Sequence, residues 1–213
     1  MDALAHIDLK TKEIKAIGRT LNIVRIGTSG SVQADIPVDS FVISEKSIGC
    51  DGVLRFYANN ESVCDHPFEE AFIRHCRWTP SAARPYVVNA DPGLVDRLYD
   101  EEHTIKGVTL TAVGFYGPQG RVLRLPLAMP GINDRITAFR YEGYKVTNYE
   151  MESAAITGLC NLLGHRAATI CLIIANRING DASADYHSYM NKLIRYTLSL
   201  IHISEPTRHA QIS

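Results

Sequence analysis

The sequence predicts a single α/β domain, because apolar segments of strand length alternate with amphipathic segments of helix length. With 213 residues and a hydrophobic share of 46%, the chain can bury one sizeable core. Residues 167–175 form a wholly apolar run, which is typical of a strand buried on both faces of a sheet. No internal repeat, low-complexity segment or linker divides the chain.

Strands are expected where short apolar runs are bounded by turn residues. These runs are residues 21–26, 41–44, 85–90, 108–115, 146–149 and 167–175. Helices are expected where apolar positions recur at helical spacing or where a capping residue opens a segment. These segments are residues 68–77, 91–102, 132–140, 152–163 and 186–201. Residues 47–66 contain several Gly and Asn turn signals and are expected to be irregular.

Composition excludes several classes of protein. The formal net charge of −1 gives no general attraction to nucleic acid or to an acidic membrane. No apolar run reaches the length of a membrane span, and the first residues lack a signal-peptide pattern. Five cysteines without paired spacing indicate reduced thiols. A cytoplasmic location is therefore expected.

One group of residues is a candidate metal site: Cys64, His66, His75 and Cys76. Its spacings, Cys-x-His and adjacent His-Cys, do not match the usual zinc-binding pairs. A polar surface segment is the favoured interpretation, and no metal is expected there.

The first candidate binding segment follows the strand that carries Arg25. Residues 27–31 combine glycines with hydroxyl side chains, among them Gly27 and Thr28. Backbone N–H groups and hydroxyls in such a loop can bind an anion, and an arginine can add a charged contact. The sequence is neither a Walker loop nor a dinucleotide fingerprint. A tight turn without a ligand explains these residues equally well.

The second candidate segment follows residues 108–115. Gln119 and Arg121 lie two residues apart, so an extended segment places both on one side. An amide and a guanidinium suit the edge of a planar base that carries carbonyls, although a solvated turn is the alternative. Asn176 and Arg177 likewise end the apolar strand.

The third candidate segment is the corner at residues 146–155, where a strand gives way to a helix. Glu150 and Glu152 can accept hydrogen bonds from sugar hydroxyls, and Met151 can lie against a sugar ring. The alternative places Met151 in the core and the glutamates in the first turn of a helix, where acids are common. Because several strand ends carry polar groups, one shared pocket is the simplest expectation.

These three segments, in this order, resemble the nucleoside phosphorylase family, and within it the branch that acts on uridine. The resemblance covers nearly the whole chain and rests on Arg25-Ile26-Gly27-Thr28-Ser29-Gly30, residues 115–121 and Tyr149-Glu150-Met151-Glu152-Ser153. It implies a three-layer α/β/α fold around a central mixed β-sheet, with one domain over residues 1–198. It also implies reversible phosphorolysis of uridine to uracil and ribose 1-phosphate.

The resemblance assigns roles residue by residue. Phosphate would be bound by Arg25, Gly27 and Thr28. The base would be bound by Phe115, Gln119, Arg121, Ile174 and Arg177. The ribose would be bound by Glu150, Met151 and Glu152. Catalysis would depend on Arg25, Arg121 and Glu152. No metal or organic cofactor is implied, and inorganic phosphate is the co-substrate.

Three alternative functions remain open on the same fold. A purine nucleoside phosphorylase of this family places an aspartate after a serine where this chain has Ala175-Asn176-Arg177. A hydrolytic nucleosidase would not need the phosphate-binding arginine. A catalytically inactive nucleoside-binding fragment is the third alternative, because the family has further phosphate-site residues in a segment that precedes the position of Met1.

Both ends depart from the family pattern. The chain is expected to be an N-terminally truncated fragment, and residues 199–213 are expected to be a non-native tail. The resemblance also implies a homo-oligomer, a hexamer built from dimers, for the full-length parent.

Overall fold

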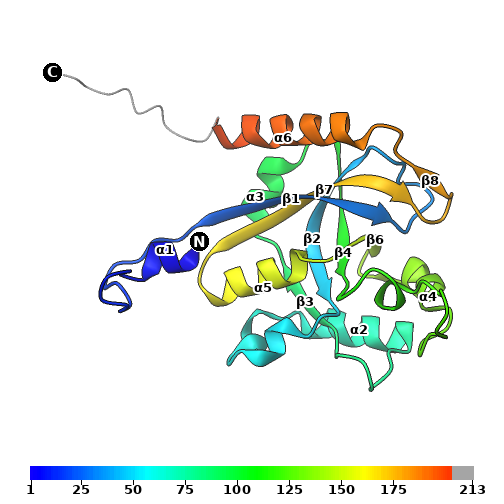
Figure 1. The fold of residues 1–213 in the computed structure, drawn as a ribbon, viewed down its shortest axis with the longest axis horizontal. Coiled ribbons are helices and arrows are strands. Elements are labelled where there is room, and N and C mark those ends of the chain that lie inside the picture. The colour runs from blue at the N-terminus through cyan, green and yellow to red at the C-terminus, as the bar shows by residue number, and fades with distance from the viewer. Residues whose placement is uncertain (203–213) are drawn as a thin grey trace.

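In the computed structural model, which describes residues 1–202, a mixed eight-stranded sheet lies between two layers of helices (Figure 1). The strands are β1 (Asn22–Ser31), β2 (Phe41–Gly49), β3 (Tyr86–Asn89), β4 (Thr104–Thr111), β5 (Arg140–Tyr141), β6 (Tyr144–Glu150), β7 (Arg166–Asn176) and β8 (Asp181–Ala182). Their order across the sheet is β3-β2-β4-β6-β1-β7-β8, and β5 pairs with β6. This arrangement confirms the three-layer α/β/α fold.

The sheet closes on itself because β2 pairs with β7 as well as with β3 and β4. The pairings β2–β4, β4–β6 and β1–β7 are parallel, whereas β1–β6 and β2–β7 are antiparallel. β2, β4, β6, β1 and β7 each have a partner strand on both sides for part of their length, and β1 pairs with β6 only at Gly30 and Ser31.

Two helices cover one face of the sheet: α3 (Pro92–Leu98) and α6 (Tyr186–His202). Leu94, Leu98 and Leu193 from these helices pack with Ile170 and Leu172 of β7. Asp91 caps α3 by accepting a hydrogen bond from the Leu94 backbone N–H, as the sequence predicted.

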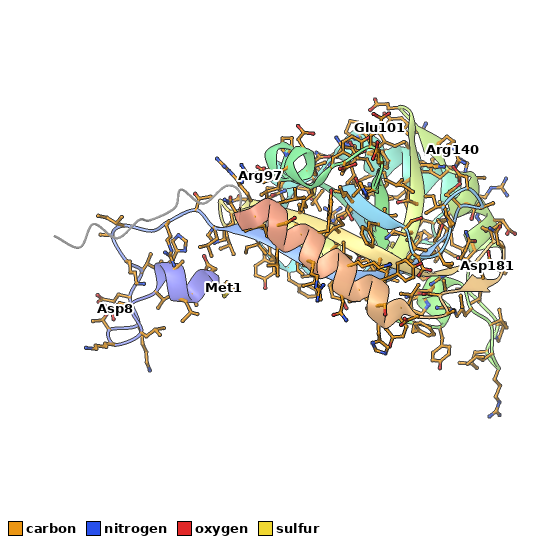
Figure 2. All side chains as sticks on the ribbon, turned by 90° about the horizontal axis from the view of Figure 1, so that it is seen from above. Met1, Asp8, Arg97, Glu101, Arg140 and Asp181 are labelled. Atoms are coloured by element: carbon orange, nitrogen blue, oxygen red, sulfur yellow. The ribbon has the colours of Figure 1, made fainter. Side chains whose placement is uncertain are left out.

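Three helices cover the other face: α2 (His66–Cys76), α4 (Ile132–Ala138) and α5 (Ser153–Leu162). Phe68 and Phe72 of α2 pack edge-on against Phe139, which follows α4. A short helix, α1 (Asp2–His6), stands to one side, and Met1 and Asp8 lie at the opposite end of the molecule from Arg140 and Asp181 (Figure 2).

Several sequence predictions of element bounds were wrong; β2, for example, runs to Gly49 rather than to residue 44. Residues 27–31 are not a loop, because β1 runs on to Ser31. Pairing with β7 along most of β1, and with β6 at its end, outweighs the turn preference of the glycines. β4 ends at Thr111, so Phe115 lies beyond the strand, and α3 ends at Leu98 rather than at residue 102.

Two further regions are residues 47–66 and the start of the expected tail. Residues 47–66 contain the end of β2 and two short 3₁₀ helices, η1 (Val53–Phe56) and η2 (Asn60–Val63), so they are only partly irregular. The helix α6 includes residues 199–202, and the rest of the expected tail, residues 203–213, lies outside the described residues. Within residues 1–202, no helix has the length and apolar character needed to cross a bilayer.

Candidate functional site

The carboxyl ends of four strands meet at one place in the fold. Thr111 of β4 lies opposite Glu150 of β6, and Gly30 of β1 lies opposite Tyr149. Ser31 is in register with Asn176 of β7. The polar residues that the sequence singled out at three strand ends are therefore brought together by the pairing of β1, β6 and β7.

Glu150 is a buried carboxylate that holds the corner between β6 and α5. Only 4% of the residue is exposed. One carboxylate oxygen accepts hydrogen bonds from the Thr111 hydroxyl at 2.5 Å and the Ser153 hydroxyl at 2.6 Å. The other accepts the backbone N–H groups of Glu152 and Ser153, both at 2.8 Å. Its oxygens thus bind the first N–H groups of α5, where a negative charge is stabilised.

Arg25 reaches the same corner from β1. Its guanidinium lies 3.2 Å from Glu150, also pairs with Glu152, and donates to the Cys171 sulfur at 3.3 Å. Burial by itself would lower the pKa of Arg25, but Cys171 and the two glutamates raise it above its usual value. Gly27 leaves room for the Arg25 side chain, because a Cβ at residue 27 would lie only 2.6 Å from the Arg25 guanidinium.

The remaining residues predicted to bind phosphate and ribose are more accessible. The side chain of Glu152 is 55% exposed, and Met151 is 39% exposed. Thr28 is half-buried within β1, in register with Leu172 of β7. The corner therefore has a buried carboxylate, Glu150, and an accessible one, Glu152.

A second cluster gathers around Gln119, at the end of the short 3₁₀ helix η3 (Gly117–Gln119). Gln119 is 2% exposed, and its amide oxygen accepts hydrogen bonds from Arg121, at 2.7 Å, and from Arg177. Arg121 also donates to the Phe115 carbonyl at 2.5 Å, and its guanidinium lies 3.9 Å from the centre of the Phe115 ring. The structure thus brings together four of the five residues predicted to bind a base.

The charge of this second cluster has no acidic partner. In the part of the chain that is described, neither Arg121 nor Arg177 forms an ion pair with a carboxylate. Burial and the neighbouring Arg121 lower the pKa of Arg177 to about 10. The Nε of Arg177 is buried and has no hydrogen-bond partner within residues 1–202, and the Arg177 guanidinium lies 4.4 Å from the centre of the Tyr149 ring. Two guanidinium groups and an unpaired N–H donor suit an electron-rich ligand.

A cavity of about 950 Å³ borders this cluster through Arg121 and Tyr116. Apolar side chains such as Leu123, Leu125 and Leu127 form much of its wall. Ile174, the fifth predicted base-binding residue, is half-buried and packs against the core beneath α3 and α6.

Asn176 occupies the position where purine-cleaving members of the resembled family were expected to have an acid. It is 1% exposed and donates both amide hydrogens, to the carbonyls of Gln33 at 2.9 Å and Ile36 at 2.8 Å. Its oxygen accepts the backbone N–H groups of residues 178 and 179. Asn176 therefore braces the backbone at the end of β7.

In the described part of the chain, the four residues Cys64, His66, His75 and Cys76 do not gather into one group of metal ligands. His66 pairs with Glu61 and Glu69, His75 meets the Arg135 carbonyl, and Cys76 is buried in the core. All five cysteines are free.

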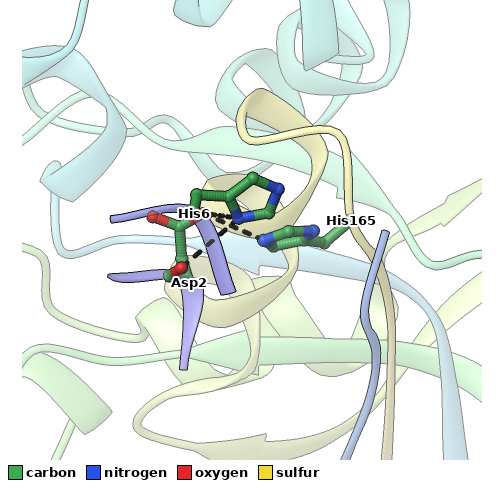
Figure 3. A group of neighbouring side chains, drawn as sticks. All are labelled: Asp2, His6 and His165. Carbon is green, nitrogen blue, oxygen red and sulfur yellow. Dashed lines mark hydrogen bonds and ion pairs between the residues drawn. The ribbon is translucent and has the colours of Figure 1, made fainter. Parts of the chain in front are cut away.

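Asp2, His6 and His165 also gather closely at the N-terminal end of the molecule (Figure 3). The Nδ1 of His165 accepts the Leu21 N–H at 3.3 Å, so its Nε2 carries the proton in the neutral ring and donates to Asp2 at 3.1 Å. A metal at that Nε2 would have to displace this proton. Asp2, His6 and His165 are therefore better explained as a hydrogen-bonded group than as a metal site.

Sequence reasoning missed several residues that complete the two clusters. Thr111 and Ser153 hold Glu150, and Tyr149 and Asn133 contact the Gln119 cluster. Tyr149 and Ser153 lie within the motif that the sequence analysis selected, which gave them no role of their own, so the motif was a usable signal. Asn133 and Thr111 are distant in sequence and gave none.

Comparison with known proteins gives the same family. Residues 11–201 match the model of the Phosphorylase superfamily. A uridine phosphorylase of Thermococcus kodakarensis is 26% identical over 176 residues, which cover 80% of this chain and 53% of the relative. Uridine phosphorylase A of Schistosoma mansoni is 36% identical over 160 residues, covering 74% of this chain and 49% of the relative.

Among solved structures, a Trypanosoma brucei nucleoside phosphorylase, described as showing uridine phosphorylase activity, superposes with a TM-score of 0.79 at 22% identity. The match covers 95% of this chain and 74% of that one. The chain therefore belongs to the phosphorylase superfamily and has the nucleoside phosphorylase fold. It spans about half the length of the curated relatives that it matches.

Proposed function

We propose that this protein is a pyrimidine nucleoside phosphorylase that converts uridine and phosphate to uracil and ribose 1-phosphate. The observation that carries the proposal is the convergence of Arg121 and Arg177 on the buried amide of Gln119 without an acidic partner. Such a site favours a planar, carbonyl-bearing base that becomes negatively charged.

The base departs with its bonding electrons, and the negative charge of uracil spreads over its carbonyl oxygens. Arg121 and Arg177 bind that charge more strongly than they bind the neutral base, which lowers the barrier to bond cleavage. The Gln119 amide NH₂ adds a donor, while the ring of Phe115 packs against the base. A half-buried, preorganised pair of guanidinium groups is effective here, because little reorganisation accompanies the reaction.

Phosphate attacks the anomeric carbon, and the sugar becomes oxocarbenium-like as in other glycosyl transfers. Arg25 positions the phosphate and offsets its charge, with Thr28 and the backbone at Gly27 beside it. Because Arg25 is paired with the accessible Glu152, phosphate has to compete with that carboxylate for the guanidinium.

The ribose is bound at the corner between β6 and α5. Glu152 accepts hydrogen bonds from the ribose hydroxyls, and its negative charge favours a cationic sugar. Met151 lies against the sugar ring, and Glu150 holds the backbone that presents both residues. The reaction uses inorganic phosphate as co-substrate and no metal or organic cofactor. In the cell the protein is proposed to be a cytoplasmic homo-oligomer, a hexamer built from dimers.

Uracil release from uridine by the purified chain, with and without inorganic phosphate, tests the proposal, with inosine in parallel. Phosphate-dependent release from uridine alone is the expected result. Phosphate-independent release would assign a nucleosidase, and release from inosine would assign a purine phosphorylase. If uracil binds without turnover, the chain is a nucleoside-binding fragment.

Two arginine variants make the test specific. Arg121→Ala is expected to reduce uracil release by about 100-fold or more, because it removes a positive charge that stabilises the negative charge of the departing base. Arg97→Ala, on α3 at the opposite helix layer, is the matched control and is expected to leave release unchanged. Equal rates for the two variants would reject the base site.

A further inference from the structure

The hydrogen bonds of Asn133 single it out among the residues that surround the proposed base site. It is the second residue of α4, and its side-chain NH₂ donates to the carbonyls of Gln119, at 3.1 Å, and Gly120, at 3.4 Å. Its oxygen accepts the Tyr149 hydroxyl at 3.2 Å. Asn133 thus connects three segments: η3, α4 and the end of β6.

The backbone at Gly120 has the shape needed for this contact. Gly120 has φ +69°, a left-handed conformation that glycine adopts without strain. A Cβ at this position would lie 2.5 Å from the Asn133 amide nitrogen. A side chain at residue 120 would therefore displace Asn133 as well as strain the turn.

Both ends of the Asn133 side chain lead to residues that bind the base in the proposed function. Through its NH₂ it fixes the backbone of Gln119, whose side-chain oxygen is shared by two arginines. Through its oxygen it holds Tyr149, whose ring lies under the guanidinium of Arg177. Tyr149 is 2% exposed, so its hydroxyl depends on such a partner.

We infer that Asn133 is a positioning residue for base recognition: it fixes Gln119 and Tyr149 so that the Gln119 amide and the Arg177 guanidinium face the base together. The inference rests on the proposed function. The proposed role of Asn133 is limited to the base subsite. Loss of Asn133 should therefore weaken binding of the base and leave the phosphate contacts at Arg25 unchanged.

Variants separate the two halves of the contact. Asn133→Asp keeps an acceptor for the Tyr149 hydroxyl but puts an oxygen against the two carbonyls. Tyr149→Phe keeps the ring under Arg177 and removes only the hydroxyl. Asn161→Ala is the matched control, because Asn161 also donates to a backbone carbonyl, that of Asn89, at 3.1 Å, away from the site.

Hydrogen exchange gives a readout that needs no ligand. The N–H groups of Gln119, Gly120 and Arg121 bond to carbonyls of residues 116 and 117. We expect Asn133→Asp to speed their exchange on the order of tenfold, while peptides from β2 and β7 exchange as before. Unchanged exchange at residues 119–121, or faster exchange throughout the chain, would overturn the inference.

Binding of uracil and of phosphate, each measured by calorimetry on the same variants, completes the test. Asn133→Asp is expected to weaken uracil binding on the order of tenfold and to leave phosphate binding unchanged, with a smaller loss for Tyr149→Phe. Equal losses for both ligands, or unchanged uracil affinity, would overturn the inference. If the unsubstituted chain binds no uracil, the proposed function fails, and the exchange result alone decides whether Asn133 positions the turn.

Discussion

The two arginine clusters of this protein differ in how their charge is balanced. Arg25 lies between two carboxylates. One of them, Glu150, is buried, and both of its oxygens accept hydrogen bonds. Arg121 and Arg177 share one neutral amide oxygen. The first cluster therefore stabilises the fold, whereas the second retains unsatisfied positive charge that a ligand can use.

Removing the buried carboxylate should have the largest effect. Glu150→Ala leaves Arg25 without its buried partner and leaves two hydroxyls and two backbone N–H groups without an acceptor. We expect the free energy of unfolding to fall by about 3–5 kcal/mol, measured by urea denaturation. Glu150→Gln, which keeps the size and one acceptor, should lose less. A loss below about 1 kcal/mol for Glu150→Ala would show that the first cluster is not structural.

Removing the shared amide should have the next largest effect. Gln119→Leu leaves both guanidinium groups without their common acceptor, so we expect a loss of about 1–3 kcal/mol in urea denaturation. The double variant Gln119→Leu with Arg177→Met should recover part of that loss, because one unpaired charge is then absent. Additive losses in this double-mutant cycle would contradict the shared contact.

Removing one guanidinium should act in the opposite direction on stability. The pKa of Arg177 is lowered to about 10 on folding, so its charged form destabilises the folded state at every pH below about 10. This cost is relieved only as the pH rises above about 10 towards the ordinary pKa of an arginine. At pH 7, Arg177→Met should therefore unfold at an equal or higher temperature, with uracil affinity reduced. A clear fall in unfolding temperature would mean that Arg177 stabilises the fold.

The smallest effect is expected at the exposed carboxylate of the first cluster. The Glu152 side chain is 55% exposed, so its ion pair with Arg25 is screened by solvent and salt. Glu152→Gln should lower the free energy of unfolding by no more than about 1 kcal/mol, and the difference should shrink in high salt. A salt-independent loss as large as that of Glu150→Ala would remove the distinction between the two glutamates.

Local patterns predicted most of the elements correctly. The apolar runs of β2, β3, β6 and β7, and the capped or amphipathic segments of α2, α3, α4, α5 and α6, all form at the expected places. The errors concern the ends of elements and the short elements α1, β5 and β8, which were not predicted. Residues 27–31 form a strand because β6 and β7 supply hydrogen-bond partners, and partners that are distant in sequence leave no local signal.

The site was predicted in part. Gln119, Arg121 and Phe115 come together within one turn, so sequence spacing was enough to group them. Their union with Arg177, 58 residues from Gln119, depends on the pairing of β1 with β6 and β7. Asn133 is part of this site only because α4 packs beside that turn, which the sequence did not indicate.

The sequence by itself determined the alternation of strands and helices and the chemical groups offered at the strand ends, because both depend on residue type and local spacing. The tertiary structure decided which groups are buried. Glu150 and Glu152 are two residues apart, and a sequence pattern gives them the same chemistry. Pairing of β6 with β4 and β1 buries Glu150 against Thr111 and Arg25, while Glu152 at the start of α5 remains accessible to solvent. Burial depends on contacts between segments that are distant in sequence, and the pairing of the strands brings those segments together.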